Sequence, residues 1–182
     1  FNLSDLKKPV LSDLQFVQMG EFYPIITEQH NSLCNYAQKY YIDGFGLKKE
    51  NALLIDSEEI ELAENKHFTE IFPDYLIDLT LRFREAKSNI EQLQKDSLFK
   101  IDNWCTSYEN KIREKGGIGF FLGGIGPDGH IAFNTKGSDH FSTTRLTKTN
   151  FETQAITAAD LGGIEVSKNR LVITIGLGTI NY

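Results

Sequence analysis

Residues 118–130 read IGFFLGGIGPDGH, an apolar run that passes directly into a glycine-rich loop. A nearly continuous apolar run is typical of a strand that is covered on both faces, as the strands of parallel sheets are. In such sheets ligands bind outside the carboxyl ends of the strands, which is where this loop begins. Glycines permit positive φ angles and let the backbone come close to a ligand. The stretch therefore predicts a strand at 118–123 that leads into a ligand-binding loop.

Three further apolar runs predict strands at 14–19, 52–55 and 171–176. Between them, apolar residues recur every three or four positions over 33–41 and 101–112, and Thr149 with Glu152 forms a capping-box pattern at the start of another helix. Strands that alternate with helices favour parallel pairing beneath helical layers. We therefore expect an α/β fold with a helix-flanked, mainly parallel, Rossmann-like sheet. A second glycine turn, GLGT at 176–179, should open on the same sheet edge as the first.

The segment 62–100 departs from this alternation of strands and helices. Apolar residues spaced alternately by three and four predict one long helix over 74–95 with a narrow seam of the coiled-coil kind. The seam residues are Leu76, Leu79, Phe83, Ala86, Ile90 and Leu93. This helix either lies on its own domain or docks against a partner subunit or a neighbouring domain, and fewer than three heptads do not decide between these alternatives. We treat residues 1–182 as a single domain with a helical insertion at about 62–100.

The composition, with 40% hydrophobic and 24% charged residues among 182, is that of an ordinary soluble globular protein. A net charge of −6 without a Lys/Arg cluster argues against nucleic-acid binding. No apolar run approaches the roughly 20 residues that span a bilayer, and the start has none of the parts of a signal peptide. It also lacks an initiator Met, so we expect a piece of a longer chain. Cys34 and Cys105 stand outside any metal-binding spacing and predict buried, reduced thiols in a cytoplasmic protein.

Asp128 and His130 carry the candidate chemistry of the glycine loop. Because they are two positions apart in a non-helical loop, their side chains can project to the same side. A carboxylate there can fix the tautomer of the imidazole and make the ring a proton carrier near neutral pH. Successive N–H groups around Gly124 and Gly126 can form a concavity that binds an anion. The alternative is a plain turn with a solvated Asp and an incidental His, which a lone glycine-rich loop does not exclude.

The stretches LGGIGPDGHIAFN, STTRLT and LVITIGLGTI, together with FVQMGEFYPI and QHNSLCNYAQKYYI, resemble the glucosamine-6-phosphate deaminase (isomerase) family. The related 6-phosphogluconolactonases share the DGH but not usually the IAFN. The likeness covers about residues 14–61 and 101–180. It implies a cytoplasmic enzyme of amino-sugar (N-acetylglucosamine) catabolism that converts glucosamine 6-phosphate to fructose 6-phosphate and ammonia without a metal or an organic cofactor. By the same resemblance Asp128 and His130 open the sugar ring.

Several positions depart from the family pattern. Where the family has an Asp–Glu pair whose Asp moves the proton between C1 and C2, this chain has Gly20 followed by Glu21. Either Glu21 turns inward and replaces that base, or Glu21 has a structural task and the base is absent. A Glu of the family's proton relay falls on Thr135, and a phosphate-binding Arg falls on Ala159. The family's N-terminal phosphate loop and a further C-terminal phosphate ligand have no counterpart in the chain, so we expect an N- and C-terminally truncated domain.

Three functional hypotheses remain. The first is the isomerase/deaminase, with catalysis by Asp128, His130 and Glu21 and substrate binding at Gly124 and Gly126. The second is a catalytically impaired sugar-phosphate-binding or regulatory domain of the same family, and the third is a hydrolase of the 6-phosphogluconolactonase kind, against which IAFN weighs. The expected partner is a small sugar phosphate rather than nucleic acid or membrane, with a possible homo-oligomer or fused neighbouring domain. We also expect an incomplete sheet with an uncovered apolar edge.

Overall fold

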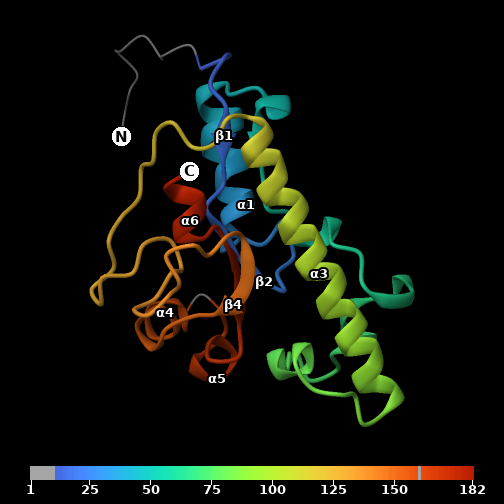
Figure 1. The fold of residues 1–182 in the computed structure, drawn as a ribbon. Helices are drawn as coiled ribbons and strands as arrows, with labels where there is room; N and C mark the ends of the chain where they lie inside the picture. Colours follow the sequence, from blue (N-terminus) through green and yellow to red (C-terminus); the bar gives the residue numbers. More distant parts are fainter. Residues whose placement is uncertain (1–10, 160) are drawn as a thin grey trace.

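The computed structural model describes residues 11–159 and 161–182, in which one long helix lies along a group of short strands (Figure 1). The strands are β1 (Phe16–Val17), β2 (Gly20–Tyr23), β3 (Ala52–Leu53), β4 (Arg145–Lys148) and β5 (Leu171–Thr174). The α-helices are α1 (Leu33–Tyr36), α2 (Phe68–Ile71), α3 (Asn89–Glu114), α4 (Phe151–Thr157), α5 (Ile164–Ser167) and α6 (Leu177–Ile180). A π-helical stretch, η1 (Ala37–Asp43), continues α1, and 3-10 turns lie at η2 (Lys49–Asn51), η3 (Ser57–Glu59), η4 (Ala63–Asn65) and η5 (Leu79–Arg82).

The strands pair in two small sheets. β1 and β3 run parallel, whereas β5 lies between β2 and β4 and is antiparallel to both, so that Ile173 pairs with Glu21 on one side and Leu146 on the other. The α/β class is confirmed, but the prediction of a mainly parallel sheet is wrong for the described residues. All four residues of β5 are buried, which explains the continuous apolar run. A continuous apolar run indicates that both faces of the strand are buried, but it does not indicate the direction of the neighbouring strands.

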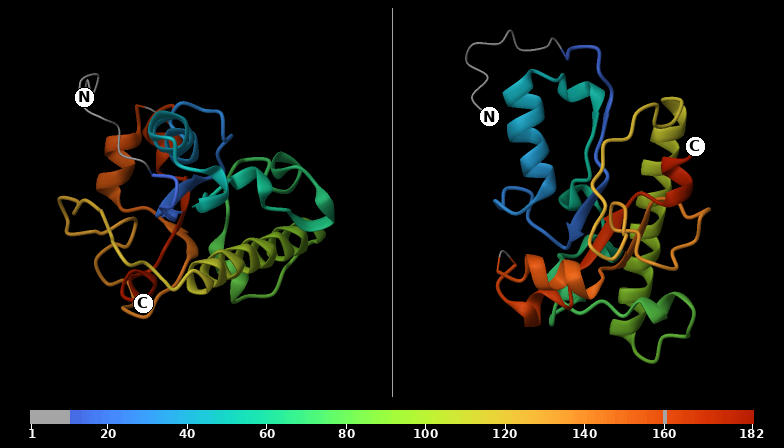
Figure 2. Two further views of the ribbon diagram at one scale, coloured as in Figure 1. Left: turned by 90° about the horizontal axis from the view of Figure 1, so that it is seen from above. Right: turned by 90° about the vertical axis from the view of Figure 1, so that its left-hand side faces the viewer.

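The strand predicted at 118–123 does not form. The segment belongs to the long loop that leaves the end of α3 (Figures 1 and 2), and it has no strand partner among the described residues. Phe120 and Leu122 are 82% and 79% exposed. Apolar side chains alone do not make a strand, because the ladder also needs N–H and C=O groups from a neighbour. The exposed apolar side chains here belong to a loop, so the expected uncovered sheet edge stays a prediction.

Helix α3 supplies much of the core. Its buried side chains recur every three or four residues, the period from which the helix over 101–112 was expected: Leu98, Ile101, Cys105, Tyr108 and Ile112. They form one cluster with apolar residues of α2, β4 and β5. None of the helices in the described part of the chain is long and apolar enough to cross a membrane.

Adjacent polar residues of α3 reach both sheets. The hydroxyl of Tyr108 donates to the carbonyl of Leu53 in β3 at 2.9 Å. The carboxylate of Glu109 accepts from the hydroxyls of Thr144, just before β4, and Thr179 in α6, at 2.8 and 2.7 Å. Buried polar groups need such partners, because an unpaired one costs free energy of folding. One turn of α3 thus connects β3 with the region around β4 and α6.

Both cysteines are buried free thiols, as the sequence predicts. Burial is the main cause that raises the pKa of Cys34 and of Cys105 to about 12. The two thiols therefore stay protonated at neutral pH and behave as small apolar side chains.

The single long helix predicted over 74–95 is wrong. Asp78 caps η5, and Ser88 caps α3 by accepting the backbone N–H of Glu91 at 3.2 Å. Arg84 ties the two turns together through ion pairs to Asp78 and Glu91 at 2.8 and 2.9 Å. Capping groups compete with helix continuation, so they decide the boundary against the apolar spacing. Phe83, in the middle of the predicted seam, is 91% exposed.

Candidate active site

The glycine loop folds into a tight turn that brings Asp128 and His130 together. Gly129 has a φ of +84°, and the N–H groups of Gly129 and Gly126 donate to the carbonyls of Gly126 and His130, each at 2.9 Å. Asp128 Oδ1 then contacts Nδ1 of His130. Because Nδ1 faces a carboxylate, it carries the proton, and Nε2 is left as the acceptor nitrogen. The predicted juxtaposition of acid and imidazole is present, and its catalytic use remains a prediction.

Gly126 lies directly beneath the imidazole. A Cβ at this position would stand 1.9 Å from Cε1 of His130, so a larger residue would push the ring away from Asp128. The position of a Cβ at Gly124, by contrast, has no atom within 4 Å. Neither glycine has a positive φ, and the N–H of Gly126 is used inside the turn. Gly126 thus positions His130, while an anion site at the two glycines remains a prediction.

Asn150 is a third member of this cluster, and sequence reasoning missed it. It caps α4 by accepting the backbone N–H of Thr153 at 2.9 Å. Its Nδ2 donates to Asp128 Oδ2 and lies 3.2 Å from His130 Nδ1. The hydrogen bond from His130, with a smaller contribution from Asn150, holds the pKa of Asp128 below its ordinary value. The sequence places the cap one residue too early, at Thr149, although Asn is equally favoured at such a position.

His130 lies on the wall of an apolar groove of about 1100 Å³. The groove also takes in Gly20, Phe133 and the loop segment 117–122, and the rest of its lining comes mainly from residues 14–19 and from α1 and η1. Apart from His130, its basic side chain in the described residues is Lys115, which donates to Gln15 Oε1 at 2.6 Å. The groove therefore offers apolar cover for a ligand and few charged groups for a phosphate.

Glu21 does not line this groove. Its side chain on β2 is completely buried, and the carboxylate accepts four hydrogen bonds. The donors are Phe22 N at 2.8 Å, Leu33 N at 3.1 Å, Ser32 Oγ at 2.8 Å and Cys34 N at 2.6 Å. Burial raises the pKa of Glu21, although these hydrogen bonds oppose the rise. The carboxylate anchors the start of α1 on β2, which favours the structural alternative for this residue.

Gly20 meets the groove beside Phe133. A Cβ at position 20 would stand 2.7 Å from the ring of Phe133 and 3.1 Å from the carbonyl oxygen of Ile173. Phe133 packs edge-to-face on Phe22, with ring centroids 5.6 Å apart, and so has little freedom to give way. An acid at position 20 and this placement of Phe133 therefore exclude one another.

The segment after the first glycine loop contacts the chain next to the second glycine turn, while a common sheet edge for the two turns stays a prediction. Asn134, of which 3% is exposed, donates through Nδ2 to the carbonyl of Ile175 at 2.9 Å, just before the GLGT turn. Thr135 supplies no carboxylate, and neither Thr135 nor Ala159 lines the groove. In residues 11–159 and 161–182, no group of three or more His, Cys, Asp or Glu is placed to hold a metal ion.

No protein-family model matches the chain. The chain is 44% identical over 95 residues to the glucosamine-6-phosphate deaminase of Borrelia hermsii, a match that covers 52% of this chain and 35% of that protein. It is 46% identical over 76 residues to human glucosamine-6-phosphate deaminase 2, covering 42% of this chain and 28% of that protein. The matched part thus spans about a third of the length of these curated relatives.

A solved structure of a monomeric glucosamine-6-phosphate deaminase, described as a missing link of the NagB superfamily, has a similar fold. The TM-score is 0.65 with 18% sequence identity, and the match covers 98% of this chain and 57% of that one. At this identity the likeness concerns the fold. Together with the partial matches above and the DGHIAFN motif, it shows that the chain is similar to glucosamine-6-phosphate deaminases.

Proposed function

We propose that this chain forms part of an isomerase/deaminase that converts glucosamine 6-phosphate to fructose 6-phosphate and ammonia. The observation that carries the proposal is His130 on the wall of the apolar groove, with its Nδ1 in contact with Asp128. The names of the relatives support the choice of an amino-sugar phosphate. The proposal places the reaction in the cytoplasm and requires no metal or organic cofactor.

In the proposed reaction His130 opens the pyranose ring. Its Nε2 removes the proton of the anomeric hydroxyl and returns a proton to the ring oxygen, while Asp128 stabilises the imidazolium between the two transfers. Asn150 holds the second carboxylate oxygen, so that Asp128 stays aimed at the ring. The aldose–ketose step then needs a base at C2. Glu21 serves as that base only if its carboxylate leaves its four hydrogen bonds.

Release of ammonia and fructose 6-phosphate from glucosamine 6-phosphate tests the proposal directly. His130→Gln should lower turnover by roughly 10²–10⁴-fold, the usual contribution of a positioned proton carrier. His140→Gln is the matched control, because His140 is exposed and does not line the groove. An active wild type that keeps its turnover in His130→Gln would exclude the assigned role.

A second candidate is a sugar-phosphate-binding domain that does not turn over its ligand. The packing of Phe133 against Gly20 and the complete burial of Glu21 favour it, because both leave the groove without a carboxylate base. Saturable binding of glucosamine 6-phosphate, with neither ammonia release nor exchange of the C2 proton with solvent, is the result that this candidate expects.

A further inference from the structure

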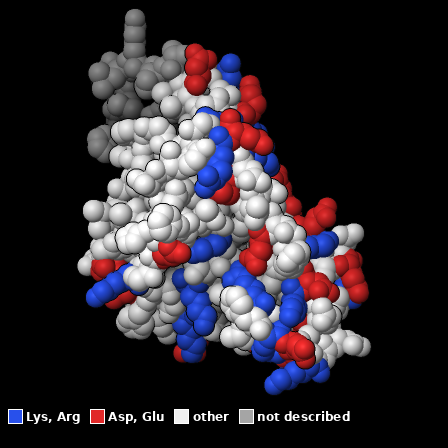
Figure 3. All heavy atoms as spheres, viewed as in Figure 1, with Lys and Arg blue, Asp and Glu red and all other residues white. Residues whose placement is uncertain are grey.

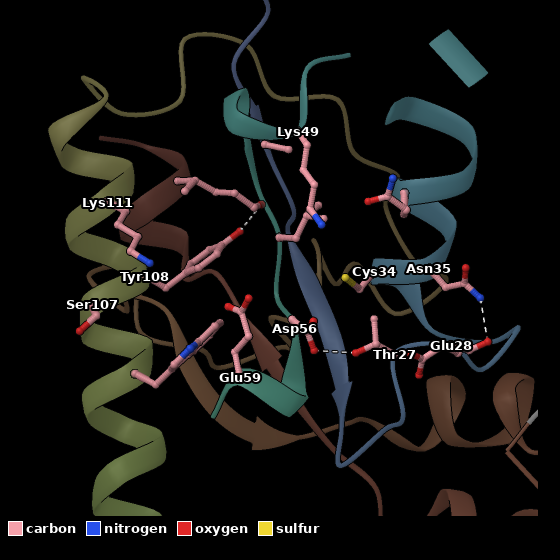
Figure 4. Close-up of a pocket in the computed structure, with 15 residues that line it drawn as sticks. Thr27, Glu28, Cys34, Asn35, Lys49, Asp56, Glu59, Ser107, Tyr108 and Lys111 are labelled. Atoms are coloured by element: carbon pink, nitrogen blue, oxygen red, sulfur yellow. Dashed lines mark hydrogen bonds between the residues drawn. The ribbon is translucent and has the colours of Figure 1, made fainter. Parts of the chain in front are cut away.

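A second hollow, of about 410 Å³, lies between α3, β3 and α1, and none of its lining residues belongs to the groove beside His130 (Figure 4). Its size is within the range of roughly 300–1,000 Å³ that small-molecule sites occupy. β3 forms its floor, and side chains from α3, α1 and the residues around η2 and η3 form its walls. Such a hollow can hold a ligand without any contact to the candidate active site.

Besides Glu28, four charged side chains line this hollow from different elements. Figure 4 shows Lys111 reaching in from α3, Lys49 from η2, and Asp56 and Glu59 from the turn after β3. Among the described residues, none of the four forms an ion pair within 4.0 Å. Charges of both signs thus share one concave surface without neutralising one another, and a ligand can offer each of them a partner.

Three of these charged groups also affect the pKa of the buried Cys34 thiol. After burial itself, Asp56, Glu21 and Glu59 raise the pKa of this thiol, whereas Lys49 lowers it. Asp56 is held in place because its Oδ1 accepts the hydroxyl of Thr27 at 2.6 Å. Opposite charges therefore act on one point of the hollow wall, and one of the carboxylates is already fixed.

A rigid aromatic wall completes the hollow. The indole of Trp104 stacks on Tyr108, with ring centroids 5.4 Å apart and an interplanar angle of 18°. Tyr108 is itself fixed, because its hydroxyl lies 2.9 Å from the carbonyl oxygens of both Gln18 and Leu53 and donates its one proton to either of them. Trp104 is only half-buried and lines the hollow. An indole beside carboxylates is a favourable surface for an ammonium group, through cation–π attraction and ionic hydrogen bonds.

We propose that this hollow binds a small zwitterion, a molecule that carries a primary ammonium group and a phosphate group. The ammonium lies against Trp104 between Asp56 and Glu59, and the anionic group lies between Lys49 and Lys111. The site is independent of the proposed catalytic function, since it shares no residue with the groove of His130.

Trp104 makes a direct experiment possible, because it is the single tryptophan of the sequence. Its fluorescence is titrated with glucosamine 6-phosphate, with glucose 6-phosphate, which lacks the amine, and with glucosamine, which lacks the phosphate. We expect a saturable change with the first compound and at least tenfold weaker binding of the other two. Equal binding of glucose 6-phosphate would contradict the proposal, because it would show an anion site that does not recognise the ammonium group. The absence of a response to any of the three compounds would also overturn it.

Matched variants locate the binding. Lys49→Met and Glu59→Gln should each weaken binding about tenfold, because each removes one ionic hydrogen bond. Their controls are Lys48→Met and Glu50→Gln, at exposed positions outside the hollow, which should bind as the wild type does. His130→Gln should leave the Trp104 response unchanged, so loss of the proposed catalysis and loss of this site can be told apart. If both pairs of variants weaken binding equally, the effect is one of overall charge and the site is excluded.

Discussion

Glu21 illustrates how neighbouring donors can give a side chain a structural role. Three of its four hydrogen bonds come from Ser32, Leu33 and Cys34, at the point where α1 begins. A carboxylate can accept all four because both oxygens have two lone pairs. The family pattern identifies this position, but only the fold reveals that the carboxylate holds α1 against β2.

We predict that Glu21→Gln destabilises the protein by roughly 1–3 kcal/mol, since the amide –NH₂ would face groups that donate hydrogen bonds. Thermal unfolding should show a midpoint lowered by several degrees. Glu50→Gln, at an exposed position, is the control. An unchanged midpoint in Glu21→Gln would contradict the anchoring role and return Glu21 to the catalytic candidates.

The contact between Gly20 and Phe133 leads to a second prediction at this scale. Gly20→Asp, which restores the acid of the family pattern, should not raise activity alone and should cost roughly 1–3 kcal/mol through overpacking. Combining it with Phe133→Ala should cost less than the sum of the two single changes, which thermal unfolding of all four proteins measures as a coupling energy. Gly124→Ala, where a Cβ meets nothing within 4 Å, is the control. Strict additivity would show that the ring does not occupy the space needed by the acid.

At the scale of elements, the start of α3 depends on a small network of charges. Arg84 pairs with Asp78 and Glu91, on either side of the boundary between η5 and the helix. The pKa of Asp78 falls to about 2, through hydrogen bonds from Thr80 first and Arg84 second. The pKa of Glu91 also falls to about 2, mainly through Arg84. The stabilisation that these ion pairs give to the start of α3 therefore depends on pH.

We predict that Arg84→Met lowers stability above pH ~5 and has little effect near pH 2. A lowered folded-state pKa means that the stabilisation is fully present above the ordinary carboxyl values of about 4 and is lost as the pH falls toward 2. Acid titrations followed by circular dichroism should show the wild-type and variant curves converging at low pH. Lys136→Met, at an exposed position away from this network, should follow the wild type throughout. A constant difference down to pH 2 would rule out the ion pairs as the cause.

Some elements were predictable from the sequence and others were not, for different physical reasons. The buried apolar face of α3 that includes Ile101 and Ile112 was predictable, because apolar residues recur there every three or four positions. The direction of β5 does not, because Leu171–Thr174 is apolar on both faces whichever way its neighbours run. The seam through Phe83 was misleading because the caps at Asp78 and Ser88 outweigh apolar spacing. In the candidate site, the loop spacing gave the Asp128–His130 pair, whereas Asn150 joins it through a contact 20 residues away that no local pattern records.

At the scale of the whole molecule, part of the exposed apolar surface lies along the groove. Phe120, Leu122 and Ile125 are 82%, 79% and 75% exposed, in the loop that follows α3. Figure 3, which shows one face of the molecule, has extended areas without charged side chains between the Lys, Arg, Asp and Glu clusters. Contiguous apolar surface of this kind promotes association.

We predict that the protein associates with itself as its concentration rises, and that Phe120→Glu combined with Leu122→Lys suppresses this association. Sedimentation velocity at a series of concentrations measures the effect. Phe83→Glu is the control, because Phe83 is also exposed but lies outside the groove. If the double variant associates as strongly as the wild type, a different surface is responsible.

Tyr108 and Glu109 have a consequence for how the molecule opens. Since one residue holds Leu53 and the next holds Thr144 and Thr179, lifting α3 away breaks contacts to both sheets in a single event. The two sheets are then one cooperative unit rather than two that fray separately. Native-state hydrogen exchange should report this directly, with the amide protons of β3 and β5 sharing a common opening free energy and a common denaturant dependence.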